Sequence, residues 1–118
     1  MDIDLTKLPI IDWDQGLRLA GNRKELAHEI LGMLVSRLNE DLALIKELSE
    51  NSDYSALKDQ IHKLHGAVCY CGTPRLKTVL SVLETDLKNT IMTNLPSHLH
   101  QLNDEVSLLL DHYSSHRN

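Results

Sequence analysis

Leucine, isoleucine and valine recur at intervals of three and four residues along most of this chain, and this spacing constrains the fold more than any other feature. An α-helix completes a turn in 3.6 residues, so side chains at these intervals form one apolar stripe along a helix. The longest such stretch runs from Arg23 to Ser49. Its apolar residues are Leu26, Ile30, Leu31, Leu34, Val35, Leu38, Leu42, Ile45 and Leu48. The spacing predicts a long amphipathic helix, and no segment alternates as a half-buried β-strand would.

Residues that favour turns divide the sequence into further pieces of helical length. The stripes and these breaks predict helices from about Asp12 to Ala20, Arg23 to Ser49, Tyr54 to Cys71, Pro74 to Leu87 and Pro96 to Tyr113. We expect Asn22 to cap the start of the second helix and Gly72 to end the third. Thr73 suits the N-cap of the fourth helix, because Pro74 then occupies the first helical position, where proline is tolerated.

Four long amphipathic helices joined by short links are typical of an antiparallel up-down bundle. We therefore predict an all-α four-helix bundle with the short first helix across one end, where Trp13 would close the core. A chain of 118 residues has the length of one domain, so residues 1–118 are expected to form a single unit. The two end segments, residues 1–9 and 114–118, are expected to be flexible.

The charge and the motifs of the chain exclude several classes of function. The formal net charge is −5, and an acidic protein lacks the basic patch that nucleic-acid binding requires. No apolar run is long enough to span a membrane, and no glycine-rich phosphate loop suggests an ATP site. Cys69 and Cys71 lie two residues apart on a helix and are poorly placed to form a disulfide. These features predict a cytoplasmic protein with no nucleic-acid partner and no direct membrane contact.

The most informative residues lie in the third helix. Placing successive residues about 100° apart puts His62 about 140° from the apolar stripe, so His62 faces solvent. Gly66 points away from the core one turn later, and His65 lies on the flank. A glycine inside a helix costs about 1 kcal/mol relative to alanine, so an exposed one indicates that another molecule approaches closely beside His62. A docking partner would then contact the outer face, for which the candidates are Ser55, Asp59, Cys69 and Tyr70.

Two other readings of this region are open from the residues alone. His62, His65 and Cys69 stand at positions i, i+3 and i+7, and zinc binds histidine nitrogen and cysteine sulfur. A metal-binding bundle would need a fourth ligand from another helix. Alternatively, the chain is a non-catalytic helical interaction module, because most surface histidines have no chemical role and a free cysteine usually behaves as a small apolar residue.

The third helix resembles the histidine-containing phosphotransfer (Hpt) domain family. That family has histidine, then leucine two residues on, lysine usually at three, glycine at four and glycine at ten. The corresponding positions here are His62, Leu64, His65, Gly66 and Gly72. The run from His62 to Gly66, followed by residues 72–75, is closer still to the C-terminal Hpt domains of BarA-type tripartite hybrid sensor histidine kinases. The resemblance covers nearly the whole chain, since it extends to the bundle architecture.

The resemblance implies a function in two-component signal transduction. His62 would accept a phosphoryl group from an aspartate on the receiver domain of a hybrid sensor kinase and pass it to the aspartate of a response regulator. Gly66 would allow close approach, and His65, at the usual lysine position, would support the phosphoryl charge. No cofactor is expected on this chain, and the Mg²⁺ would belong to the receiver. The domain is expected to be a monomer. It is also expected to be a part excised from a parent kinase, which would be anchored in the inner membrane.

Overall fold

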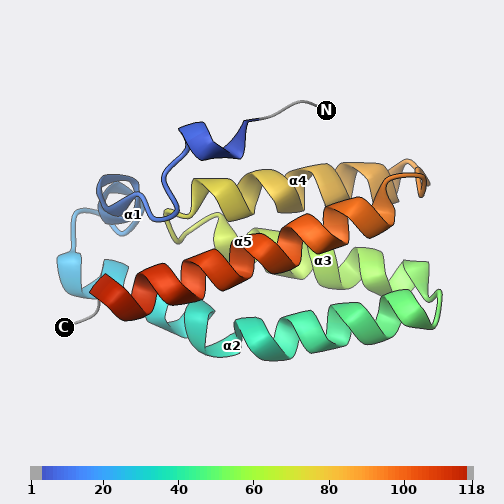
Figure 1. Cartoon of the computed structure of the whole chain (residues 1–118). Helices are drawn as coiled ribbons and strands as arrows, with labels where there is room; N and C mark the ends of the chain where they lie inside the picture. Colours follow the sequence, from blue (N-terminus) through green and yellow to red (C-terminus); the bar gives the residue numbers. More distant parts are fainter. Residues whose placement is uncertain (1–3, 117–118) are drawn as a thin grey trace.

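The computed structural model describes residues 4–116, and every regular element among them is a helix (Figure 1). The elements are the 3-10 helix η1 (Leu5–Lys7) and the α-helices α1 (Trp13–Leu19), α2 (Lys24–Glu50), α3 (Tyr54–Val68), α4 (Pro74–Lys88) and α5 (Leu95–His116). Of the two end segments expected to be flexible, the described parts are partly helical, with Leu5 buried. Residues 1–3 and 117–118 lie outside the described residues.

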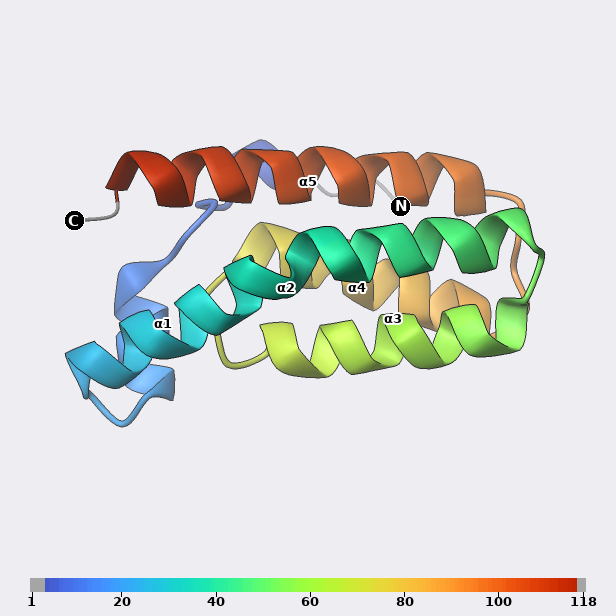
Figure 2. The ribbon, with the colours of Figure 1, turned by 90° about the horizontal axis from the view of Figure 1, so that it is seen from below.

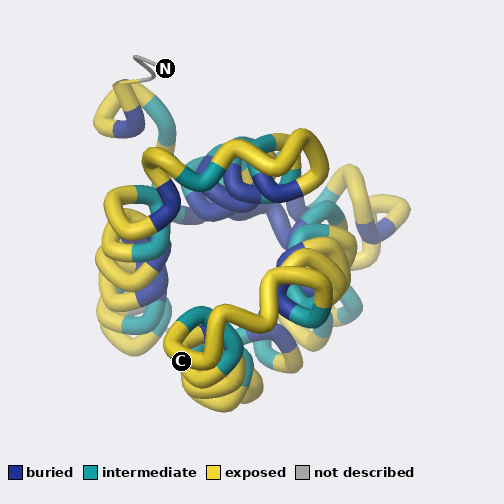
Figure 3. Tube along the Cα trace, turned by 90° about the vertical axis from the view of Figure 1, so that its right-hand side faces the viewer, coloured by how far each residue is buried: buried dark blue, intermediate teal, exposed yellow. Residues whose placement is uncertain are grey.

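The four long helices form an antiparallel bundle, which confirms the predicted all-α fold. Helix α3 packs against both α2 and α4, α4 packs against α5, and α5 returns along α2. Figure 2 shows successive helices running in opposite directions, and the end-on view of Figure 3 shows buried residues on the inward side of the helices. Among the described residues no helix is both long and apolar enough to cross a membrane.

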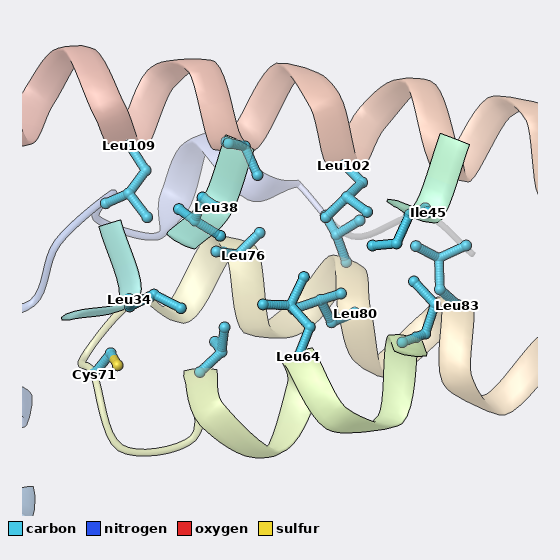
Figure 4. Packing of buried hydrophobic residues seen from close by; sticks show 14 of the residues in the cluster. Leu34, Leu38, Ile45, Leu64, Cys71, Leu76, Leu80, Leu83, Leu102 and Leu109 are labelled. Atoms are coloured by element: carbon cyan, nitrogen blue, oxygen red, sulfur yellow. The ribbon is translucent and has the colours of Figure 1, made fainter. Parts of the chain in front are cut away.

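The core consists almost entirely of leucine, isoleucine and valine from the predicted stripes. Each helix of the bundle contributes its apolar face, and Figure 4 shows labelled side chains from all four long helices together with Cys71 from the α3–α4 link. The largest of the fully buried side chains are Leu31, Leu38, Leu57, Ile61, Leu76, Leu80, Leu83, Leu102 and Leu109. Complete burial of one such side chain contributes about 1.5–3 kcal/mol, so the stripes supply the main driving force for folding.

Helix α1 lies across one end of the bundle, as predicted, and a backbone contact with the α3–α4 link holds it there. The Asp12 N–H donates a hydrogen bond of 2.8 Å to the Gly72 carbonyl. Gly72 has a φ of +66°, and a Cβ there would lie 2.6 Å from the Asp12 carbonyl oxygen and 2.8 Å from the nitrogen of Gly16. Only glycine allows this approach. Trp13 is half-buried against the core and stacks on His28 at 4.9 Å.

Three predicted helix ends were wrong, one of them in α5, which continues to His116, three residues past the predicted end at Tyr113. Asn22 does not cap α2, because its φ of +64° places it in the left-handed region, and Arg23 is the N-cap residue. Helix α3 ends at Val68, three residues before the predicted end. Gly72 therefore lies in the link rather than directly after the helix. The predicted start of α4 is confirmed, with Thr73 as N-cap and Pro74 in the first turn.

A buried ion pair joins α4 to α5. Arg75 donates two hydrogen bonds to the carboxylate of Glu105, from Nε at 2.9 Å and from an Nη nitrogen at 2.6 Å. The two side chains are only 15% and 5% exposed. Such a paired arrangement satisfies both charges, whereas either one alone would be strongly destabilising in this position.

Candidate functional site

Helix α3 presents His62 to solvent, as helical geometry predicted. The side chain is 78% exposed, while the neighbouring Ile61 is completely buried in the core. Gly66 lies on the same exposed face, and a Cβ added to it would meet nothing within 4 Å. His65 lies on the flank toward α4 and is 20% exposed. The structure therefore brings together an exposed imidazole and an open stretch of helix surface.

Glu84 of α4 is a member of this site that the sequence reasoning missed. Its carboxylate oxygens lie 3.0 and 3.1 Å from Nδ1 of His62 and 3.3 and 3.4 Å from Nδ1 of His65. One carboxylate thus bridges two imidazole rings one turn apart on α3. The available signal was weak, because Glu84 follows the buried Leu83 as an ordinary polar residue at the edge of the α4 stripe.

The ionised state of Glu84 determines which nitrogen of each ring carries a hydrogen toward it. Burial would raise the pKa of the Glu84 carboxyl, but hydrogen bonds from His62 and His65 outweigh it and hold the pKa below its ordinary value. An ionised carboxylate can only accept hydrogen bonds. Each Nδ1 must therefore carry a hydrogen, and a neutral His62 then keeps its free lone pair on Nε2. A neutral ring nitrogen at the surface is a competent nucleophile.

An apolar groove of about 320 Å³ runs between α2 and α3, on the side of α3 that faces α2 rather than α4. Its lining residues are Ile30, Met33, Leu34, Arg37, Asp41, Gln60, Lys63, Leu64, Ala67, Tyr70 and Cys71. Met33 and Tyr70 are 62% and 63% exposed, so two large side chains stand open to solvent at the groove. The amide of Gln60 donates to Asp41 across it at 3.4 Å. A groove of this composition suits a transient protein interface with an apolar centre and a charged rim.

The structure distributes the four predicted docking residues over different surroundings. Tyr70 lines the groove, but Ser55 and Asp59 are exposed in the first half of α3 and do not line it. Cys69 is half-buried. The exposed Met33 of α2 was not among the candidates, since its spacing relative to α3 cannot be read from the sequence.

The second cysteine is part of the packing rather than of the exposed face. The Cys71 thiol donates to the Ala67 carbonyl at 3.3 Å, and burial raises its pKa to about 11. Of the residues that the alternative metal reading would use, His62 and His65 both turn Nδ1 to Glu84. Within residues 4–116 no group of three or more histidine, cysteine, aspartate or glutamate side chains is arranged to hold a metal ion.

Several known proteins resemble the chain over most of its length. It is 40% identical over 95 residues to the sensor protein GacS of Pseudomonas syringae pv. syringae, which covers 80% of this chain and 10% of GacS. It is 35% identical over 97 residues to the histidine-protein kinase BarA of Escherichia coli K12, which covers 81% of this chain and 11% of BarA. The chain thus spans about a tenth of the length of these relatives.

A solved structure and a family model agree with these relatives. The crystal structure of the Hpt domain from a sensor hybrid histidine kinase of Shewanella is 32% identical and has a TM-score of 0.79, covering 98% of this chain and all of that one. The model of the Hpt domain matches residues 29–112, which include the whole site around His62. The resemblance seen in the sequence is confirmed, and the chain belongs to the Hpt domain family.

Proposed function

We propose that the chain relays a phosphoryl group through His62 between two receiver domains, as the Hpt part of a hybrid sensor kinase in two-component signalling. The observation that carries this proposal is the state of His62: its ring is exposed, and Glu84 holds Nδ1 so that Nε2 faces outward with a free lone pair. The open surface at Gly66 supports it, because a receiver active site must reach Nε2 closely. Membership of the Hpt family supports it independently.

The transfer step follows from these groups. The lone pair of His62 Nε2 forms a bond to phosphorus, and the bond from phosphorus to the aspartyl oxygen of the receiver breaks. The electron pair leaves with that oxygen, so the receiver regains its carboxylate. The His62 ring becomes a cation that retains the Nδ1 hydrogen, and the Glu84 carboxylate 3.0 Å away stabilises this charge. The same steps in reverse deliver the group to a second aspartate.

The receiver would supply the remaining catalytic groups. Phosphoryl transfer depends mainly on positioning and on neutralising the charge of the phosphoryl oxygens. We propose that the Mg²⁺ needed for this is held by the acidic residues of the receiver. The contribution of this chain is an accessible nitrogen, a fixed tautomer and a helix face without a side chain at Gly66.

The α2–α3 groove is the proposed docking surface for the receiver. Met33 and Tyr70 would form the apolar centre of the contact, while Arg37 and Lys63 would contribute positive charge at its rim. Lys63 and Tyr70 line the groove on the side of α3 that faces α2, and His62 projects about 100° from Lys63 around the helix. We infer that a receiver seated on the groove also extends across the outer face of α3, where His62 and Gly66 are exposed. The proposed relay also carries the expectation that the domain is a monomer and works in the cytoplasm.

Incubation with a phosphorylated receiver domain tests the assignment of His62. We expect the wild type to gain a phosphate that is labile in acid and stable in alkali, and His62→Gln to gain none while retaining its helical circular dichroism. His100→Gln is the matched control, because His100 is equally exposed on α5, where it pairs with the nearby Asp104 at 3.5 Å. A phosphate that persists on His62→Gln would overturn the proposal.

A further inference from the structure

His65 is bound to the same carboxylate as the proposed phosphoacceptor, but its surroundings are different. Its Nδ1 lies 3.3 Å from Glu84, and the side chain is 20% exposed, compared with 78% for His62. The other ring nitrogen, Nε2, is buried and meets no hydrogen-bond partner among the described residues. His65 is therefore fixed on one side and enclosed on the other, whereas His62 is fixed on one side and open on the other.

This enclosure determines which ring nitrogen of His65 makes the contact. Since the ionised Glu84 only accepts, Nδ1 of His65 must carry a hydrogen whether or not the ring is charged. Nε2 is buried without a hydrogen-bond partner among the described residues, so Nδ1 is the atom through which His65 acts on its surroundings.

Building on the proposed function, we propose that His65 is a positioning residue for transfer through His62: its ring donates from Nδ1 to Glu84 and holds that carboxylate against Nδ1 of His62. This is a different role from the charge support that its place in the family motif suggests. The role requires a hydrogen-bond donor at the position of Nδ1, and it does not require a positive charge.

The geometry explains why Glu84 needs a second anchor. A glutamate side chain has several rotatable bonds and loses substantial conformational entropy when it is held in one place. Nδ1 of His62 approaches both carboxylate oxygens, but the ring is largely exposed, so this contact competes with water for the carboxylate. Nδ1 of His65 also approaches both oxygens, at 3.3 and 3.4 Å, and its ring is only 20% exposed, so its contact is better shielded from water. With this bond in place, Glu84 is already oriented when a receiver arrives, and His62 keeps its nucleophilic lone pair on Nε2.

Two uncharged substitutions of His65 distinguish the effect of its hydrogen-bond donor from the effect of its charge. In His65→Asn the side-chain amide nitrogen stands at the same distance along the side chain as Nδ1, so it can still donate to Glu84. His65→Leu fills a similar space without a donor. We expect His65→Asn to keep the transfer rate within about twofold of wild type and His65→Leu to lose about tenfold, the cost of one hydrogen bond to a charged group. His100→Leu serves as the matched control, and urea unfolding verifies that each variant is folded.

The tautomer of His62 gives a readout that a merely structural role would not change. We expect ¹⁵N NMR of the wild type and of His65→Asn to show a protonated Nδ1 and a free Nε2 on His62. In His65→Leu both nitrogens should move toward values averaged between the two tautomers.

Each contrary result has a definite meaning. If the transfer rate of His65→Asn is as low as that of His65→Leu, the charge of His65 matters and the proposal is wrong. If His65→Leu leaves both the tautomer and the rate unchanged, His65 has no positioning role. The NMR measurement needs no phosphorylated partner, so it remains decisive if His62 proves not to accept phosphate, and a failed tautomer test leaves phosphorylation of His62 untouched.

Discussion

Replacement of Gly66 by alanine should make the protein more stable, which is unusual for a residue assigned to the functional site. Glycine in the interior of an exposed helix is less favourable than alanine by about 0.5–1 kcal/mol. The added Cβ would meet nothing within 4 Å, so no clash offsets this gain. With an m-value of about 1.5 kcal/mol per M, the urea midpoint should rise by about 0.5 M.

The same substitution six residues later provides the control. Gly72 has a left-handed φ of +66°, and its Cβ would collide with the backbone of Asp12 and Gly16. The left-handed conformation and the forced displacement together should lower the free energy of unfolding in Gly72→Ala by about 2 kcal/mol or more. Equilibrium unfolding in urea, followed by circular dichroism, measures both variants under the same conditions.

The effect of Gly66 on phosphoryl transfer is tested with leucine, which is larger than alanine. Gly66→Leu should remain as helical as the wild type but slow phosphoryl transfer by about a hundredfold, because it pushes the receiver away from Nε2 of His62. Loss of stability in Gly66→Ala would show that this face is not open. Transfer at the wild-type rate in Gly66→Leu would refute the idea that glycine is present to allow close approach.

Three further outcomes can be measured. Glu105→Gln should lower the free energy of unfolding by about 3 kcal/mol, because it leaves the largely buried Arg75 without its charge partner. In urea unfolding, the double variant Arg75→Met, Glu105→Leu should recover most of this loss, and a Glu105→Gln variant as stable as wild type would contradict the burial argument. Met33→Asp should weaken receiver binding by about tenfold at unchanged stability, since the side chain is 62% exposed; unaltered binding in a titration would remove the groove as the docking surface. The depressed pKa of Glu84 contributes stability that is present above its ordinary pKa of 4.5 and is lost as the pH falls through the lower folded value, so the difference in unfolding free energy between wild type and Glu84→Gln should narrow on acidification; a difference in unfolding free energy that widens below pH 4.5 would contradict the lowered pKa of Glu84.

The bundle could be predicted from the sequence because the residues that define each helix lie within that helix or directly beside it. Leucine stripes and turn residues define each helix within its own segment, and the angle between His62 and the stripe follows from helical geometry alone. The errors fall at helix ends, where several residues compete for the same role. Asn22 has the side chain of an N-cap, yet two consecutive left-handed residues, Gly21 and Asn22, were needed to turn the chain between α1 and α2.

The partners of the site residues could not be predicted, because they come from other helices. Glu84 lies 22 residues after His62, and Glu105 lies 30 residues after Arg75. Each pairing depends on the rotation of two helices about their axes, which packing of the whole core determines. Met33 joins Tyr70 in one groove for the same reason. Periodicity shows which face of a helix is outward but not which residue of a neighbouring helix stands beside it.

The segment before residue 29 affects how this domain could be transplanted between sensor kinases. The family match begins at residue 29, but Leu5, Ile11 and Ala20 are buried, and the Gly72 carbonyl receives its hydrogen bond from Asp12. A chimaera joined at residue 29 would lack η1 and α1, which cover one end of the bundle, and would expose core leucine side chains to water. A junction placed before Asp4 would carry that cover along, and it is the boundary that a domain-swapping experiment should use.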